Sequence, residues 1–129
     1  MDFTTSEVSR ITGASLRQLQ HWDECGWIYV RMEGHSRRWS DSALRRAALF
    51  ARVGRSGIGG ILRRLAKLSN AVYSKRFFLF RAIEGKDRRG RPTGIAIPKS
   101  LIAATDDPAE VIRISTAAAH GVMLVEVPN

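Results

Sequence analysis

The sequence predicts an α+β protein built from two parts. Hydrophobic residues make up 44% of the 129 residues, which is typical of a globular chain and too many for a disordered one. In residues 1–68, capping residues and glycines enclose stretches with apolar residues at helical spacing. In residues 69–129, short runs of β-branched and aromatic residues predict strands. We therefore expect a helical domain at 1–68 and a small mixed α/β segment at 69–129.

Two short helices are expected first, within residues 4–13 and 15–26. Thr4 and Ser15 are capping residues, and Gly13 and Gly26 are helix terminators. Only Gly13 and Ala14 separate the two stretches, which is the spacing of a helix-turn-helix.

The second of these helices carries polar residues on the face opposite its leucines. At about 100° per residue, Arg17, Gln18 and His21 fall on that outer face. Arginine can fork onto guanine and glutamine can pair with adenine. The helix start at Ser15 offers backbone N–H groups to a phosphate. A solvated surface is the alternative, and the elements on either side favour contact with DNA.

Residues 27–39 predict a β-hairpin. Residues 27–30 are aromatic or β-branched, residues 33–36 are typical of a turn, and the basic pair Arg37 and Arg38 follows. We expect both arginines to contact phosphates, with an ordinary exposed strand as the alternative. Trp27 and Trp39 lie where the hairpin meets helices, so we expect them to be buried at its base rather than to stack on bases.

Two further helices are expected at 41–53 and 61–68, joined by a glycine-rich connection at 54–60. The paired arginines at 45–46 and 63–64 are interpreted as solvated helix faces, with Arg45 within reach of the DNA backbone. Residues 69 and 70 are interpreted as a short boundary before the second part.

The second part predicts strands at 77–83, 95–97 and 122–127. Pro108 follows two aspartates, which is a helix-start signal, so residues 109–119 are expected to form a helix, with a strand as the alternative. Residues 84–94 are charged and turn-like. For Arg88, Arg89 and Arg91 in that turn, an ordinary solvated loop is preferred to a second phosphate contact.

The charge of the chain points to nucleic acid. It has 17 arginines and four lysines against 12 acidic residues, a net charge of +9, of which residues 1–68 hold +6 and residues 69–129 hold +3. Arginine is always charged and matches phosphate or guanine bidentately, so this excess favours a nucleic-acid partner. Ribosome-associated and membrane-surface proteins share the same sign of charge.

No catalytic, cofactor or metal site is expected, and we interpret the chain as not an enzyme. The three histidines and Cys25 are scattered, and the lack of a polar cluster in 69–129 argues against an enzyme or ligand carrier there. A single cysteine fits a reducing compartment. We expect no signal peptide and no membrane span, and therefore a cytoplasmic protein.

One long stretch of the chain has a recognisable pattern. The run TTSEVSRITGASLRQLQHWDECGWI, followed by EGHSRRWSDSALRRAALFARV, resembles the winged-helix DNA-binding domain of the MerR family of bacterial transcription regulators. The resemblance covers about residues 3–68. It implies a second helix that enters the major groove, a hairpin wing that contacts phosphates, and two supporting helices. The positions that match the family's groove helix are Arg17, Gln18, Gln20 and His21, and those that match its wing are Arg37 and Arg38.

The chain departs from that family in two ways. Many members have Arg-Tyr-Tyr where this chain has Gln20, His21 and Trp22. Typical members continue into a long helix that pairs as an antiparallel coiled coil, whereas strand-like sequence follows Leu68 here. The segment 69–129 is small for a core of its own, yet it contains the apolar runs 77–80 and 122–127. A continuous apolar strand run implies cover on both faces, so we expect a homodimer formed through residues 69–129.

These observations predict a MerR-like winged helix-turn-helix followed by the small α/β segment, acting as a sequence-specific regulator of transcription on double-stranded DNA. The alternative is an architectural or assembly protein of a phage or mobile element, of the excisionase or terminase small-subunit type. A promoter palindrome as target favours the first function, and an attachment or packaging site favours the second. The predicted DNA-binding residues are Ser15, Arg17, Gln18, Gln20, His21, Arg37 and Arg38, on a groove helix at 15–25 and a wing at 27–39.

Overall fold

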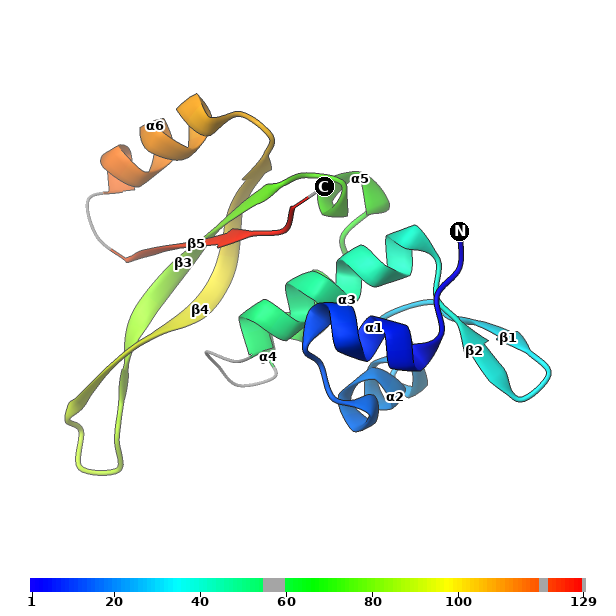
Figure 1. The fold of residues 1–129 in the computed structure, drawn as a ribbon. Coiled ribbons are helices and arrows are strands. Elements are labelled where there is room, and N and C mark those ends of the chain that lie inside the picture. The colour runs from blue at the N-terminus through cyan, green and yellow to red at the C-terminus, as the bar shows by residue number, and fades with distance from the viewer. Residues whose placement is uncertain (55–59, 119–120, 129) are drawn as a thin grey trace.

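The computed structural model describes residues 1–54, 60–118 and 121–128 (Figure 1). Within these ranges the chain has six helices and two antiparallel sheets, an α+β fold as expected. A glycine-rich connection is expected at 54–60, and its residues 55–59 lie outside the described part of the chain. In chain order the elements are α1 (Thr5–Thr12), α2 (Leu16–Glu24), β1 (Arg31–Glu33), β2 (Ser36–Arg38), α3 (Asp41–Gly54), α4 (Gly60–Leu65), α5 (Asn70–Tyr73), β3 (Phe77–Lys86), β4 (Pro92–Thr105), α6 (Pro108–Ala118) and β5 (Val122–Glu126).

The helices begin at capping residues that are visible in the sequence. The Thr4 hydroxyl accepts a hydrogen bond from the Glu7 N–H at 3.2 Å, and the Glu7 carboxylate accepts one from the Thr4 N–H at 2.9 Å. These bonds hold the pKa of Glu7 below its usual value. The predicted starts of α1 and α2 are confirmed within one residue. The segment 109–119 is a helix rather than a strand over its described residues.

The first hairpin lies later in the chain than the sequence predicts. The prediction of a strand at 27–30 is wrong. That segment is hydrogen-bonded to the end of α2 and does not pair with another strand. The N–H groups of Trp27 and Ile28 both donate to the Trp22 carbonyl, at 2.9 and 3.3 Å. Ile28 and Val30 are buried in the core. These apolar residues therefore pack in the interior without forming hydrogen bonds to a partner strand. The strands β1 and β2 that follow are three residues each.

The ends of three other elements also differ from expectation. The helix expected at 61–68 ends at Leu65, and a short helix, α5, follows where only a boundary was expected. Strands β3 and β4 are longer than the predicted 77–83 and 95–97. Their pairing runs from Lys86 opposite Pro92 at one end to Phe77 opposite Thr105 at the other. The strand order of this second sheet is β4-β3-β5.

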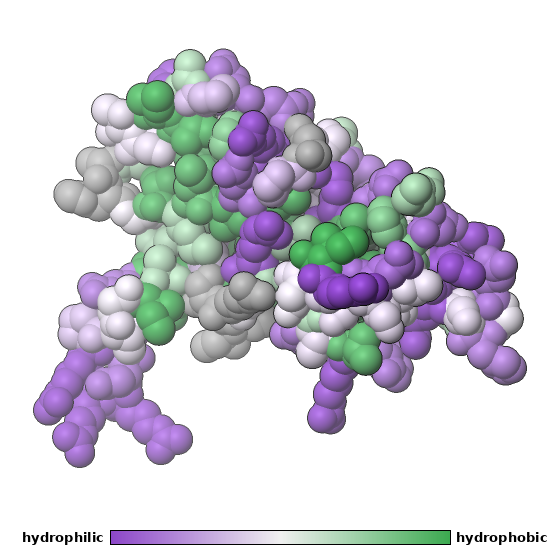
Figure 2. All heavy atoms as spheres, in the orientation of Figure 1, coloured by the Kyte–Doolittle hydropathy of each residue, from purple (hydrophilic) through white to green (hydrophobic). Residues whose placement is uncertain are grey.

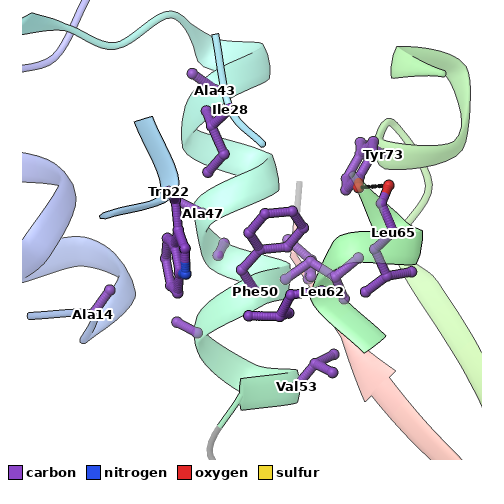
Figure 3. Close-up of a cluster of buried hydrophobic side chains, with 14 of the residues drawn as sticks. Ala14, Trp22, Ile28, Ala43, Ala47, Phe50, Val53, Leu62, Leu65 and Tyr73 are labelled. Carbon is purple, nitrogen blue, oxygen red and sulfur yellow. Dashed lines mark hydrogen bonds between the residues drawn. The ribbon is translucent and has the colours of Figure 1, made fainter. Parts of the chain in front are cut away.

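One hydrophobic core joins the helices to the second sheet. Phe78 and Phe80 on β3 belong to the same buried cluster as the apolar residues of α3 and α4. Phe50 of α3 packs edge-on against Trp22 and against Tyr73, with ring centroids 5.4 and 6.3 Å apart (Figure 3). Residues beyond position 69 therefore complete the interior of the helical part.

The opposite face of β3 is also covered by this chain. Leu79 is fully buried and points away from Phe78 and Phe80. Helix α6 packs against β3 and β4, on the side of the sheet away from α3 and α4 (Figure 1). The apolar run 77–80 thus has the cover on both faces that its sequence demands. On the Leu79 face that cover comes from α6, whereas a second chain was the expected source.

Candidate nucleic-acid interface

The connection between α1 and α2 is fixed by side chains of α1. Gly13 ends α1 with φ of 79°, a conformation that favours glycine. The Thr12 hydroxyl donates to the Val8 carbonyl at 2.7 Å and accepts from the Ala14 N–H at 3.2 Å. The Ser9 hydroxyl donates to the Ala14 carbonyl at 2.6 Å. Because both backbone groups of Ala14 are held, the direction in which α2 leaves α1 is set by α1 itself.

The start of α2 is closed by a reciprocal pair of hydrogen bonds. The Ser15 hydroxyl accepts from the Gln18 N–H at 3.0 Å, and the Gln18 side-chain oxygen accepts from the Ser15 N–H at 2.9 Å. The N–H groups of Leu16 and Arg17 remain at the helix start, where they can bind an anion. Gln18 keeps its side-chain NH₂ group for an outside acceptor.

The two faces of α2 have opposite character. Leu19 and Trp22 are buried against the core, whereas the face formed by residues 16–18, 20 and 21 is exposed. In the described part of the chain the Arg17 guanidinium has neither an ion pair nor a hydrogen bond, which leaves it available to a ligand. Even Leu16, an apolar residue, is 55% exposed. A capped helix thus presents polar side chains on an uncovered surface.

Two of the predicted site residues on α2 are engaged within the helix. The Gln20 side-chain NH₂ donates to the Glu24 carboxylate at 2.8 Å. The His21 ring lies 3.6 Å from the Cys25 Sγ and packs edge-on against Trp27, with ring centroids 5.5 Å apart. Both residues are exposed, but these contacts orient them along the helix.

The β1–β2 hairpin is fastened to the side of α2 by an ion pair. Arg37 Nε donates to the Asp23 carboxylate at 2.6 Å, and both side chains are largely shielded from solvent. The remaining nitrogens of Arg37 have no partner in the described residues. Arg38 Nε is buried without a hydrogen bond, 3.5 Å from the Glu33 carboxylate. Asp23 is the residue that sequence reasoning missed, since nothing local marks it as the partner of an arginine 14 positions away.

The base of the hairpin is bonded to the start of the chain. Phe3 and Trp39 exchange two backbone hydrogen bonds of 2.8 Å. The indole N–H of Trp39 donates to the Thr5 hydroxyl at 3.0 Å. Trp39 is fully buried, as expected, while Trp27 is only partly buried. Helix α2 and the hairpin are therefore held on one framework, with their outer surfaces free.

Arg45 does not lie on a solvated helix face, and the prediction that it does is wrong. It donates to the carbonyls of Tyr73 and Lys75 at 2.7 and 2.6 Å, and to those of Pro128 and Val127 at 3.1 and 3.3 Å. Burial lowers the pKa of the Arg45 guanidinium below its usual value. Arg45 therefore joins α3 to both ends of the second part and is directed away from any DNA at α2.

Arg46 has a similar role on the next position of α3. It donates to the carbonyls of Leu68 and Ala66 at 2.9 and 3.3 Å, and its guanidinium lies 4.2 Å from the Tyr73 ring centroid. The Asn70 side-chain oxygen accepts from it at 3.0 Å. The expectation of a solvated Arg46 is wrong for the same reason: the chain after α4 folds back over this face of α3.

The described residues offer little for other kinds of site. They contain no group of three or more histidine, cysteine, aspartate or glutamate side chains placed to hold a metal ion. None of their helices has the length and hydrophobicity needed to cross a bilayer.

No family model matches the chain, and no curated protein matches it. The interpretation of the α2 surface therefore rests on its geometry and charge.

Proposed function

We propose that this chain binds double-stranded DNA in a sequence-specific way and regulates transcription. In this proposal residues 1–68 form a winged helix-turn-helix like that of MerR regulators, α2 is the helix that enters the major groove, and the β1–β2 hairpin is the wing. The basic character of the chain, with a net charge of +9, favours association with the phosphate backbone.

The observation that carries the proposal is the uncovered polar face of α2 beside a fixed basic hairpin. The helix buries Leu19 and Trp22 and exposes the side chains at 17, 18, 20 and 21. The major groove of B-DNA admits an α-helix that presents such a face. A helix that served only to support the core would not need the hairpin to be clamped to its flank by Arg37 and Asp23.

Each exposed residue has a role in the proposed interface. Arg17, without a partner in the described residues, can donate two hydrogen bonds to a guanine edge. Gln18 can donate from its NH₂ group to a base or a phosphate, while Gln20 and His21 contact the groove wall. The free nitrogens of Arg37, with Arg38 beside it, can bind a phosphate on the flank of the groove.

The predicted homodimer through residues 69–129 remains part of this proposal, with a changed surface. Because α6 already covers Leu79, a second copy has to use what α6 and β5 leave uncovered. Ile112 on α6 is 67% exposed and Leu124 on β5 is 49% exposed. Strand β5 is also an edge strand of the sheet, and such edges can pair with a second chain.

The test is selection of a binding sequence from random duplexes, followed by titration of variants. We expect Arg17→Ala to weaken binding to the selected site by about 1–3 kcal/mol and to relax the preference at one base position. Arg63→Ala is the matched control, since Arg63 is exposed on α4 and has no partner in the described residues. An equal loss on every duplex would make Arg17 a phosphate contact only.

The kind of DNA site in which the selected sequence occurs also distinguishes the two functions that share this interface. A regulator is expected to select a promoter palindrome. An architectural or assembly protein of a mobile element is expected to select an attachment or packaging site instead.

A further inference from the structure

The β3–β4 hairpin extends beyond the sheet as an arm, here defined as residues 82–98. Strand β5 pairs with β3 only from Phe77 to Arg81, so the arm is two-stranded from Ala82 onward. At about 3.3 Å per residue, the six residues to its tip span about 20 Å. The arm projects to the lower left in Figure 1.

Burial does not explain why the arm is so long. Apart from Gly85, every residue from 83 to 96 is exposed. A two-stranded ribbon without apolar cover is only marginally stable in water. The chain nevertheless carries one, which indicates that its surface contacts something outside the protein.

The two strands of the arm approach each other closely at Gly85. A Cβ atom at Gly85 would lie 2.8 Å from the Thr93 hydroxyl oxygen and 3.1 Å from the Ile95 carbonyl oxygen. Any other residue would push the strands apart at this crossing. Gly85 therefore keeps the ribbon narrow between the sheet and the tip.

The tip of the arm is a turn organised by Asp87. Its carboxylate accepts hydrogen bonds from the N–H groups of Arg89 and Arg91 at 2.8 and 2.9 Å. The Asp87 N–H donates to the Arg91 carbonyl at 2.9 Å, and the Asp87 carbonyl accepts from the Gly90 N–H at 3.0 Å. Because the Asp87 carboxylate is used on backbone groups, it holds the turn in shape without pairing to an arginine side chain.

The cations of the tip are free. Lys86, Arg88, Arg89 and Arg91 are exposed, and none of their side chains has an ion pair or hydrogen bond in the described residues. Some arginines elsewhere, though not all, are paired with acids. These pairs include Arg31 with Asp2, Arg37 with Asp23, Arg76 with Glu126 and Arg113 with Glu110. Four unpaired cations at the end of a fixed turn are a binding surface for an anionic partner.

The tip lies toward the same edge of the molecule as the candidate groove helix in the view of Figure 1. Helix α2 and the end of the β3–β4 hairpin both lie at the lower edge of Figure 1, opposite α6. In the same orientation, Figure 2 shows hydrophilic side chains gathered at the end of the arm. A duplex lying against α2 would therefore extend toward the arm on the side away from the β1–β2 hairpin.

We propose that the arm binds the phosphate backbone of the same duplex that α2 contacts, through Arg88, Arg89 and Arg91. The guanidinium groups bind phosphates beyond the segment in contact with α2 and lengthen the footprint on that side. This inference rests on the proposed function, because it requires a duplex at α2.

The test uses the full chain and a variant with Arg88→Gln, Arg89→Gln and Arg91→Gln, titrated against two duplexes. One duplex carries the selected sequence with long flanks, and the other is trimmed to the segment that α2 contacts. Each phosphate contact contributes about 0.9 to the slope of log affinity against log salt. On the long duplex the ratio of the two dissociation constants should therefore grow about 40-fold between about 200 mM and about 50 mM salt. On the trimmed duplex the two proteins should bind alike.

The matched control removes the same charge from the other end of the sheet. It carries Lys75→Gln, Arg76→Gln and Arg113→Gln, at positions that form ion pairs with acids in this structure. We expect it to follow the unaltered chain on both duplexes, with melting temperatures confirming that all three proteins are folded.

Three outcomes would contradict the proposal. If the control loses as much affinity as the arm variant, the effect is one of overall charge and the arm is not a contact. If the arm variant binds the long duplex like the unaltered chain while Arg17→Ala still weakens binding, the arm proposal fails and the proposed function stands. If the unaltered chain binds no duplex, both fail.

Discussion

Replacing Arg45 with methionine should destabilise the fold by about 3 kcal/mol. Methionine keeps the apolar stem and removes the guanidinium, so four carbonyl oxygens lose a donor that lies 2.6–3.3 Å away. A net contribution of about 0.5–1.5 kcal/mol per hydrogen bond gives about 2–6 kcal/mol. The bonds to Pro128 and Val127 are the longer ones, and the variant no longer has to desolvate a charge, so the value falls in the lower half of that range.

Urea unfolding followed by tryptophan fluorescence and by far-UV circular dichroism measures this loss. All three tryptophans lie in residues 1–68, so fluorescence reports the helical part, while circular dichroism also reports the second sheet. Because both parts share one core, we expect the two signals to shift together. Arg63→Met, at an exposed position on α4, should change stability by less than about 0.5 kcal/mol. A loss below about 1 kcal/mol for Arg45→Met, or separate transitions for the two probes, would refute this account of how the parts are joined.

Two further predictions concern pH and assembly. Burial raises the pKa of Tyr73, whose hydroxyl donates to the Leu65 carbonyl, to about 12 (Figure 3). The folded state therefore favours the protonated phenol: its stabilising effect is complete below about pH 10 and falls by roughly 2–3 kcal/mol as the pH rises from about 10 to about 12. Tyr73→Phe should lack this fall in urea titrations at increasing pH, and parallel curves for the two proteins would contradict the assignment. By light scattering, the chain should have the mass of two copies, and Ile112→Lys combined with Leu124→Lys should shift it toward one. A single-chain mass for the unaltered protein would rule out the dimer.

Local signals in the sequence were sufficient for the helix starts. Thr4 and Ser15 are capping residues in the sequence, and both cap their helices as predicted. Each forms a reciprocal pair with the residue three positions on, Glu7 and Gln18 respectively. Such pairs depend only on neighbouring residues. Their geometry therefore requires no contact with distant parts of the chain.

The errors arose where a contact joins distant parts of the chain. Arg46 was expected on a solvated face, although it falls on the same side of α3 as the buried Phe50 and Val53, at spacings of four and seven. In the structure it lies at the edge of that buried face. What covers that edge comes from residues 66–73, which no helical pattern reveals. The strand expected at 27–30 failed similarly, since its apolar residues are buried by the core rather than by a partner strand.

The same limit applies to the candidate site. The sequence predicts the apolar face of α2 from Leu16 and Leu19. Leu19 is buried in the core as expected, whereas Leu16 is 55% exposed and Trp22 completes the buried face instead. The pairing of Arg37 with Asp23 depends on how the hairpin folds against α2. Likewise, the length of the arm depends on cross-strand pairing of polar residues, which have low strand propensity individually.

The core shared by the helices and the second sheet has a consequence for the spacing of DNA contacts. Arg45 and the buried Phe78 and Phe80 join the helical part to the base of β3, so the position from which the arm projects is set relative to α2. B-DNA turns once in about 10–10.5 base pairs. Two proposed contacts at a set spacing can therefore be satisfied together only at one helical phase. Five extra base pairs between them would turn the outer phosphates to roughly the opposite side of the duplex. In the proposed complex, the protein would therefore recognise the interval between two points on DNA as well as the bases at one of them.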